Sequence, residues 1–570
     1  MTTPTYTIQK KIEDEDVNQL HHLCEAAKPR NVKGDKRAKA LQELYDYTKE
    51  KFDVLWKRND GSRAFQILVL RGDEKLRNQL ITDFEKILFD AATTRYSCHI
   101  VNRMILKGNS AQRDRIFKIL KGRFDELLSH KIGHKVLETL YDHSNSEQKS
   151  LLLLDFYGPQ WKRQKTPISF ENICKQGKSI RNAAITNLSN NIRRVLNKNL
   201  GYLKLTQRLL FILSQAEPSA LGQFAVDFKD YCYSVDGLQA AIIAIQNAKQ
   251  DDIKASLILI EPKQRKSVLI GAGEDEIAPP ATANQDEEEE EEEAVEDFGE
   301  EEEENQNCQP TKKKAKSDGE TELGAVTASI ANDQYGWRAL CCAISYNTDI
   351  NVIKDEVIPN IFDQWENICN NKWALQLLIR LISVQQSVFH DLSFQKDKLN
   401  EELKSLVLPI LAEHALESID TLGPLDEGRY LVATIMKNLV DNVLFSQFAN
   451  AVFTKENVVD KIMHKLVRSC IQVIGAKAAD VALKTINKVG IEEVLKTPGA
   501  WIVKELISTG RYGEFETQVK NILKEHKFEG KAIDSILNPV ADKAEKPKRR
   551  FDKYQKKSGN QNQKGGNKKK

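Results

Sequence analysis

Apolar residues recur three or four positions apart along most of the chain, with polar residues between them. At that period side chains share one face of an α-helix. Alternating runs bounded by hairpin turns, which are typical of β-strands, do not occur in the sequence. The pattern therefore predicts an all-α protein built from many short amphipathic helices.

The helical pattern matches itself when the chain is shifted by 36 residues. Gly72, Gly108 and Ser144 mark a turn at the same phase, and a basic residue follows each of them: Arg77, Arg113 and Lys149. A unit of this length holds two or three short helices whose apolar faces need a neighbour, so stacked units form an α-solenoid. The apolar columns are Leu44, Leu80, Ile116 and Leu152; Tyr45, Ile81, Phe117 and Leu153; Phe84, Leu120 and Phe156; and Phe52, Leu88 and Phe124.

A second landmark recurs at that spacing: a small residue, two polar residues, two apolar residues and a further polar one. On a helix the first and third polar positions lie four apart and share a face, with the second beside them. One helix per unit is therefore expected to present three side chains outward. The three sets are Ser62, Arg63 and Gln66; Cys98, His99 and Asn102; and His134, Lys135 and Glu138.

The segment from Tyr96 to Ile105, followed by Gly108 and a charged amphipathic helix, resembles a Pumilio (Puf) repeat. The resemblance implies that the equivalent helices line a concave face that binds RNA. There the two outer members of each set read a base edge, and the middle one stacks between bases. It thus assigns RNA contacts to the nine residues of the three sets, and we add the neighbouring Arg103 as a candidate.

The sets fit the family's base-reading pattern unevenly. Ser62 with Gln66 matches a base-reading pair, whereas the pairs of the next two units match poorly because Asn102 is short and His134 is bulky. All three middle residues are cationic or can become so, which favours phosphate and stacking contacts over base readout.

Degenerate copies of this landmark recur along the rest of the chain. Residues 401–414 resemble the opening of the C-terminal CPL region of the Puf-A/Penguin branch. That resemblance implies a nuclear and nucleolar protein linked with large-subunit ribosome assembly, which binds RNA or DNA with low sequence selectivity. The copies begin at Gly177, Gly201, Gly237, Gly336, Asn371, Gly428 and Gly499. Three of them contain a tryptophan, at Trp337, Trp373 and Trp501, and we expect these side chains to pack in the core more often than to stack with bases.

The formal net charge of +2 hides strong segregation of charge. Asp286 to Glu304 holds 15 acidic and no basic residues, so removing it leaves the remainder at +17. Residues 543–570 carry 12 Lys or Arg against two acidic residues. Such segregation favours an anionic polymer as partner. In the basic tail the candidate contacts are Lys548, Arg549, Arg550, Lys556 and Lys557, and Lys312, Lys313, Lys314 and Lys316 form a candidate nuclear-import signal.

These changes in charge and repeat pattern along the chain predict five parts. They are a basic N-terminal segment (1–43), a Puf-like block (44–260), a disordered acidic insert (261–330), a degenerate Puf/CPL-like block (331–541) and a disordered basic tail (542–570). The fold expected is thus an α-solenoid of Puf-like three-helix repeats in two blocks.

The sequence gives little support for an enzyme, a metal-binding protein or a membrane protein. His130 and His134 have the spacing of helical zinc ligands, but Lys131 replaces the glutamate of the HExxH motif and no third ligand is evident. The nine cysteines form no CxxC pair, which favours a reducing compartment, and no apolar run approaches about 18 residues. We expect no catalysis, metal, cofactor, small-molecule substrate or membrane contact.

The resulting prediction is a monomeric RNA-binding scaffold of low selectivity in nucleolar ribosome biogenesis, with rRNA the expected partner and DNA or pre-ribosomal proteins as further ones. A sequence-specific Puf regulator of mRNA is one alternative, although it needs about eight intact sets. A helical scaffold or chaperone whose acidic run captures basic proteins is the other.

Overall fold

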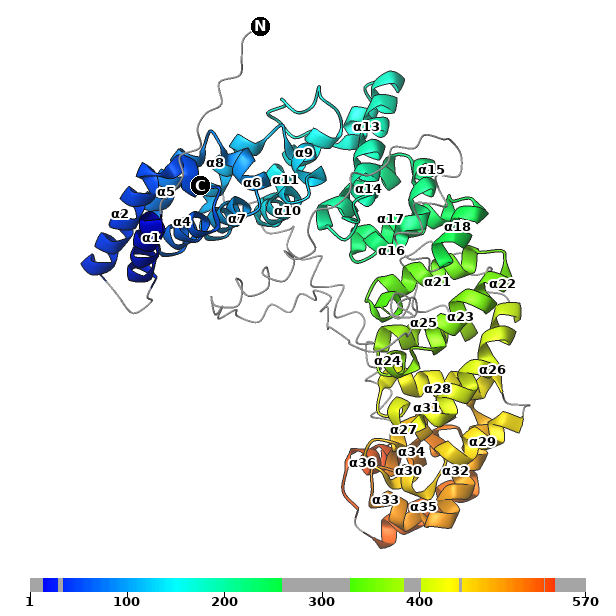
Figure 1. Cartoon of the computed structure of the whole chain (residues 1–570). Coiled ribbons are helices and arrows are strands. Elements are labelled where there is room, and N and C mark those ends of the chain that lie inside the picture. The colour runs from blue at the N-terminus through cyan, green and yellow to red at the C-terminus, as the bar shows by residue number, and fades with distance from the viewer. Residues whose placement is uncertain are drawn as a thin grey trace, which may run out of the picture.

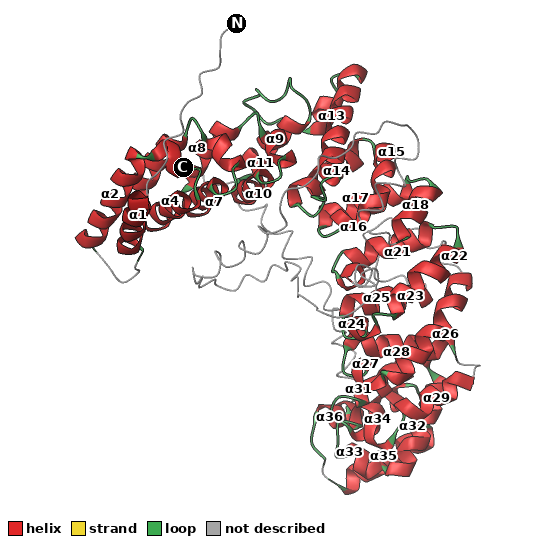
Figure 2. Ribbon diagram, in the orientation of Figure 1, coloured by secondary structure: helices red, strands yellow, loops and turns green. Residues whose placement is uncertain are grey.

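The computed structural model describes residues 14–28, 34–258, 329–383, 401–439, 443–526 and 528–538. Within those ranges every regular element is a helix and no strand occurs (Figure 2). The all-α prediction is confirmed.

One helix from each unit lies against the corresponding helix of the next unit, and together these helices form an inner row on the inside of the bent molecule (Figure 1). The row consists of α1 (Asp14–Ala27), α4 (Asn59–Arg71), α7 (Ser97–Lys107), α10 (Gly133–His143), α14 (Lys204–Ala216), α17 (Val235–Gln246), α21 (Gly336–Tyr346), α25 (Lys372–Ile382), α28 (Asp426–Asn438), α31 (His464–Ile474), α34 (Ala500–Ser508) and α36 (Lys531–Leu537).

In the regular units the chain reaches the inner helix through a longer outer helix and then a short one, an order from which the units of α14, α17, α25 and α36 depart. The longer outer helices are α2 (Asp35–Glu50), α5 (Glu74–Phe84), α8 (Ser110–Leu120), α11 (Ser146–Leu153), α13 (Lys178–Leu196), α18 (Gln250–Leu257), α26 (Glu401–Glu417), α29 (Val443–Val452), α32 (Ala476–Val489) and α35 (Gly513–Glu525). The shorter ones are α3 (Phe52–Leu55), α6 (Leu88–Thr93), α9 (Phe124–Ser129), η1 (Leu154–Phe156), α12 (Phe170–Cys174), α15 (Pro218–Leu221), η2 (Gly222–Asp227), α16 (Phe228–Tyr231), α22 (Ile350–Val352), η4 (Ile353–Val357), α23 (Ile358–Phe362), α24 (Trp365–Ile368), α27 (Ile419–Leu422), α30 (Lys455–Val459) and α33 (Ile491–Leu495).

The 36-residue period is visible in the helix boundaries. Helices α5, α8 and α11 begin at residues 74, 110 and 146, and α3, α6 and α9 begin at 52, 88 and 124. The columns Leu44/Leu80/Ile116/Leu152 and Phe84/Leu120/Phe156 are fully buried, so each unit supplies the same two layers to one continuous core. The predicted solenoid of three-helix repeats is confirmed.

The polar columns of the repeat organise the turn between an inner helix and the next outer helix. Gly72 and Gly108 end α4 and α7, and their carbonyl oxygens accept hydrogen bonds from the guanidinium groups of Arg77 (2.7 Å) and Arg113 (2.6 Å). The following helices are N-capped by side chains, for example by Asn109, whose Oδ1 accepts the Gln112 N–H at 2.9 Å. Capping satisfies backbone groups that a helix end leaves unpaired.

The inner row continues across the segment that separates the two repeat blocks, because α17 packs on α21. Beside this contact the Gln250 side chain donates to the Tyr346 carbonyl (3.1 Å), and Lys254 pairs with Asp349 at 2.8 Å. The described parts of the two blocks therefore form one stack. The acidic run 286–304 lies outside the described residues, as do Lys312–Lys316 and the tail from 539 onward, and the five domain boundaries remain predictions.

Candidate nucleic-acid interface

Several inner helices that open with glycine start in close contact with the short helix that precedes them. A Cβ atom on Gly61 would lie 2.0 Å from the Leu55 carbonyl oxygen, and one on Gly237 would lie 1.9 Å from that of Tyr231. Glycine at these positions therefore permits a backbone approach that a larger residue would block. This explains why a small residue opens the repeated landmark.

The turn before the inner helix is capped in the same way in distant repeats. The His130 Nδ1 accepts the N–H groups of Ile132 (3.2 Å) and Gly133 (3.1 Å). In the C-terminal block the Asp460 carboxylate accepts those of Ile462 and Met463, both at 2.7 Å. The equivalent side-chain acceptors fix the entry of α10 and α31 and with it the direction of their exposed side chains.

The first member of each predicted set does not point outward, which corrects the sequence-based expectation. Ser62, Cys98 and His134 are 1%, 2% and 6% exposed. Their polar atoms bond to backbone carbonyls: Ser62 Oγ to Tyr96 at 2.8 Å, Cys98 Sγ to Arg95 at 3.1 Å, and His134 Nδ1 to His130 at 3.0 Å. Burial also lowers the pKa of His134. The reason is close packing of neighbouring inner helices, which covers this position and leaves its polar atoms paired within the protein.

The middle member is exposed in all three sets, at Arg63, His99 and Lys135. In six later copies the same position, two residues after the residue that opens the landmark, is also exposed or partly exposed, whereas after Gly201 it is the buried Leu203. We call these nine residues the middle column: Arg63, His99, Lys135, Gln239, Arg338, Trp373, Tyr430, Lys465 and Trp501.

The third members and Arg103 are partly exposed but have different surroundings. Gln66 Nε2 donates to Ser62 Oγ at 3.1 Å. Asn102 Oδ1 is shielded from solvent and has no hydrogen-bond partner among the described residues. The Glu138 carboxylate accepts the Lys204 N–H (2.7 Å) at the start of α14, and burial raises its pKa. Glu138 therefore has a structural task that the sequence pattern did not reveal.

The C-terminal block contributes interface residues that sequence reasoning missed. His464 repeats the geometry of His134, since its Nδ1 lies 2.9 Å from the Asp460 carbonyl oxygen. Lys465 follows it into the middle column, and Arg468 lies over the Trp501 ring at 5.4 Å. The available signal was the likeness of Lys461-Ile-Met-His-Lys465 to Lys131-Ile-Gly-His-Lys135, which a fixed period of 36 does not detect.

The three tryptophans in the landmark copies of the second block differ in exposure. Trp337 is 1% exposed and packs in the core, as expected. Trp373 and Trp501 are partly exposed, with Lys372 Nζ and Lys504 Nζ at 4.5 and 5.1 Å from the ring centroids. A partly exposed indole beside a cation can stack on an unpaired base while the cation meets the phosphate.

Within the described ranges there is no group of three or more His, Cys, Asp or Glu side chains placed to hold a metal. No described helix combines the length and apolarity needed to cross a bilayer. The candidate tail residues Lys548, Arg549, Arg550, Lys556 and Lys557 lie outside the described part of the chain.

Comparison with known proteins agrees with this architecture. Residues 89–120 and 123–154 match the model of the Pumilio-family RNA binding repeat. The chain is 24% identical over 151 residues to Pumilio homolog 3 of Rattus norvegicus, covering 26% of this chain and 23% of that protein. It is 25% identical over 142 residues to Pumilio homolog 24 of Arabidopsis thaliana, covering 25% and 22%. These matches thus span less than a quarter of the curated relatives.

The fold likeness extends over nearly the whole chain. The crystal structure of human Puf-A superposes with a TM-score of 0.67 at 16% identity, covering 92% of this chain and 100% of that one. Human Puf-A in complex with DNA gives 0.62 at 16% identity, covering 90% and 97%. The molecule is a helical-repeat solenoid with Puf-type RNA-binding repeats. The comparisons thus identify Puf-type repeats at residues 89–154 and a whole-chain fold like that of human Puf-A.

Proposed function

We propose that the chain is a nucleic-acid-binding scaffold that grips the backbone and unpaired bases of RNA with low sequence selectivity. The middle column carries the proposal, because five of its nine members are cationic or can become so and three are aromatic. The adjoining first position, which base readout would need, is buried in eight of the nine copies, Lys372 being exposed. Cations and ring faces contact any sequence, since every nucleotide has a phosphate and a π-face.

We further propose that it acts as a monomer, without catalysis or a cofactor, in nucleolar assembly of the large ribosomal subunit, with rRNA as its main partner. The resemblance of residues 401–414 to the CPL region and the basic run 312–316 support this placement. The crystal structure of human Puf-A in complex with DNA supports tolerance toward the kind of nucleic acid bound.

A salt titration tests the binding mode. Affinity for a single-stranded RNA should fall with log[salt] at a slope of about −0.7 per neutralised phosphate, because binding releases counterions. A flat salt response, or a hundredfold preference for one short sequence, would overturn the low-selectivity proposal and favour the sequence-specific regulator.

The protein-capture alternative is separated by deletion of residues 286–304. RNA affinity should persist in this variant if the middle column is the binding surface. Loss of binding to basic proteins with unchanged RNA affinity would show that the acidic run has its own partner. Crosslinking followed by sequencing of the bound RNA would test the assignment to rRNA.

A further inference from the structure

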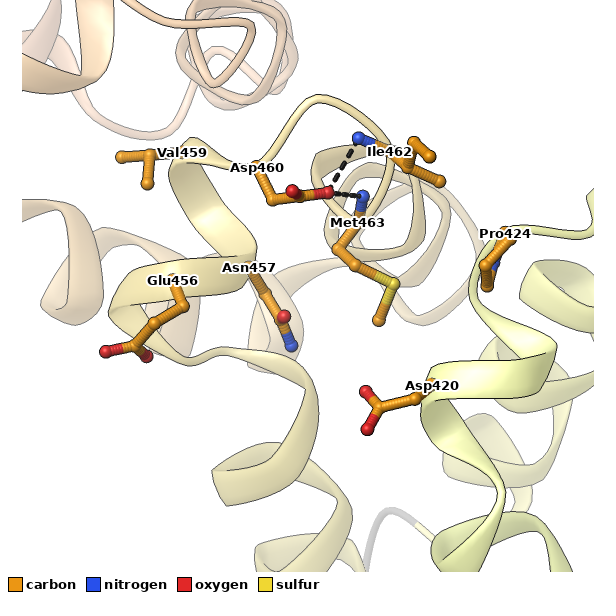
Figure 3. Close-up of a pocket in the computed structure, with 8 residues that line it drawn as sticks. All are labelled: Asp420, Pro424, Glu456, Asn457, Val459, Asp460, Ile462 and Met463. Carbon is orange, nitrogen blue, oxygen red and sulfur yellow. Dashed lines mark hydrogen bonds between the residues drawn. The ribbon is translucent and has the colours of Figure 1, made fainter.

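A groove separates α27 from α30 in the C-terminal block (Figure 3). Its volume is about 460 Å³. The residues that line it are Asp420, Pro424, Glu456, Asn457, Val459, Asp460, Ile462 and Met463. None of them belongs to the middle column, although Met463 directly precedes His464 and lies two residues from Lys465.

The floor of the groove is apolar. Ile462 is 46% exposed, and Val459, Pro424 and Met463 also line the groove. Met463 extends its thioether between the two walls (Figure 3). A thioether makes favourable contacts with aromatic rings, so a ring from an incoming segment would both cover Ile462 and contact the sulfur.

The rim of the groove is acidic. Asp420 on α27 and Glu456 on α30 are exposed, and neither makes an ion pair or side-chain hydrogen bond with another described residue. The third carboxylate, Asp460, is held by its two backbone N–H donors. Lys455 and Lys461 are exposed nearby, but neither lines the groove. The chemistry selects a segment that carries Lys or Arg beside an aromatic residue.

We propose that this groove binds the chain's own basic segment 543–557, with Phe551 on the apolar floor and the neighbouring cations on Asp420 and Glu456. Residues 548–551 read Lys-Arg-Arg-Phe, and Lys553 and Tyr554 follow shortly after. The charges and the apolar content of this segment are complementary to those of the groove.

The segment starts close enough to reach the groove. The last described helix, α36, packs on α34, and Gly499 at the start of α34 lies against the Val458 carbonyl of α30. Two helix spacings of 8–10 Å amount to about 20 Å. The 13 residues from Asn538 to Phe551 span up to about 43 Å when extended, so the connection leaves slack.

Docking would make the tail a regulator of binding. This consequence rests on the proposed function, in which the tail contacts phosphates. A tail bound in the groove cannot contact RNA at the same time, so the carboxylates of Asp420 and Glu456 compete with RNA for the tail. If the tail is docked nine-tenths of the time, the tail-dependent affinity is reduced about tenfold.

Photo-crosslinking in the full-length protein tests the contact. Phe551 is replaced by p-benzoylphenylalanine, whose excited ketone inserts preferentially into methionine C–H bonds, and crosslinked peptides are identified by mass spectrometry. We expect a crosslink within one chain to the peptide that holds Ile462 and Met463. Crosslinks to other surfaces, or between two copies in a mixture of isotopically labelled and unlabelled protein, would overturn the proposal.

A groove variant sharpens the test. Asp420→Lys/Glu456→Lys should lower the crosslink yield at least fivefold, with the thermal melting curve unchanged. The matched control is Glu514→Lys/Glu525→Lys, which reverses two exposed carboxylates on α35 and changes the net charge equally. Equal crosslink yields in the two variants would overturn the proposal.

Added single-stranded RNA separates this proposal from the general one. If both hold, RNA suppresses the crosslink, and the groove variant binds RNA several-fold more tightly than its control. A crosslink that RNA leaves unchanged would support docking and contradict the role of the tail in RNA binding. RNA binding without a crosslink to the groove would leave the scaffold function standing and overturn docking.

Discussion

The N-terminal repeats around α4, α7 and α10 and the C-terminal repeats around α28, α31 and α34 build their inner surfaces from different residues. The N-terminal ones keep the 36-residue period and its capping columns. In the C-terminal ones α31 and α34 still begin 36 residues apart, whereas α28 and α31 begin 38 apart, and Lys465 and Trp501 occupy the exposed position held by Arg63 and Lys135.

The two regions share the burial of one position of the inner helix and the exposure of the next. The first position is buried in both regions, whether as Ser62 or as Arg429, whose guanidinium bonds to the Pro424 carbonyl at 2.8 Å. The middle position remains exposed in both. Exposure of a cation or a ring is thus the shared feature, and the pair of base-reading side chains is not.

The largest expected effect separates the two kinds of tryptophan. Trp337→Ala should destabilise the fold by about 3–5 kcal/mol, because it removes a large side chain from a packed core. Trp501→Ala should leave melting nearly unchanged and weaken binding of single-stranded RNA about tenfold through lost stacking. Circular-dichroism melts and fluorescence anisotropy measure the two effects. Equal loss of stability in both variants would show that Trp501 is a core residue.

Two turn-capping carboxylates should respond to pH in opposite directions. Asp155 Oδ2 accepts the Gly122 and Phe124 N–H groups, and burial raises its pKa to about 6. The unfolded chain then loses this proton first, so stability falls as pH rises from about 4 to 6, by roughly 3 kcal/mol for a shift of about two units. In Asp155→Asn that slope should disappear from urea unfolding curves.

Backbone hydrogen bonds lower the pKa of the exposed Asp460 instead. Its contribution is therefore present above the unfolded pKa near 4 and is lost as pH falls through the lower folded value. Asp460→Asn should destabilise the protein at neutral pH and have little effect in strong acid. If stability changed with pH in the same way in Asp155→Asn and Asp460→Asn, the buried environment assigned to Asp155 and the exposed one assigned to Asp460 would be wrong.

Charge reversal tests whether the two regions act on one ligand. Arg63→Glu/Lys135→Glu and, separately, Lys465→Glu/Arg468→Glu should each weaken RNA binding about a hundredfold and flatten the salt dependence, because phosphate contacts are lost. Lys75→Glu/Lys488→Glu on the outer helices is the matched control. If the C-terminal pair behaves like the control, the interface is confined to the N-terminal repeats.

The smallest effect concerns Glu138, which caps α14. Glu138→Ala should cost about 1 kcal/mol of stability, as loss of a helix cap does. It should leave base preference unchanged in binding assays with homopolymeric RNAs. A changed preference would assign Glu138 to base readout after all.

The sequence predicted the repeat, its buried columns and the exposed middle residues, because periodicity records which face of a helix is covered. It could not predict that Ser62, Cys98 and His134 are buried, since four-residue spacing defines a face without saying how closely the next helix packs on it. The Glu138 cap joins residues 66 positions apart across an irregular junction, and no local pattern encodes such a contact.

The contact of α17 with α21 has a consequence for how the molecule folds. Most contacts in the stack link residues of adjacent units, whereas the bonds at this seam join residues 95 to 98 positions apart. Repeat arrays propagate order from neighbour to neighbour, and distant pairings form more slowly. Each of the two repeat blocks can therefore become ordered by itself. The contact between α17 and α21 then decides whether the two blocks unfold as separate cooperative units or as one.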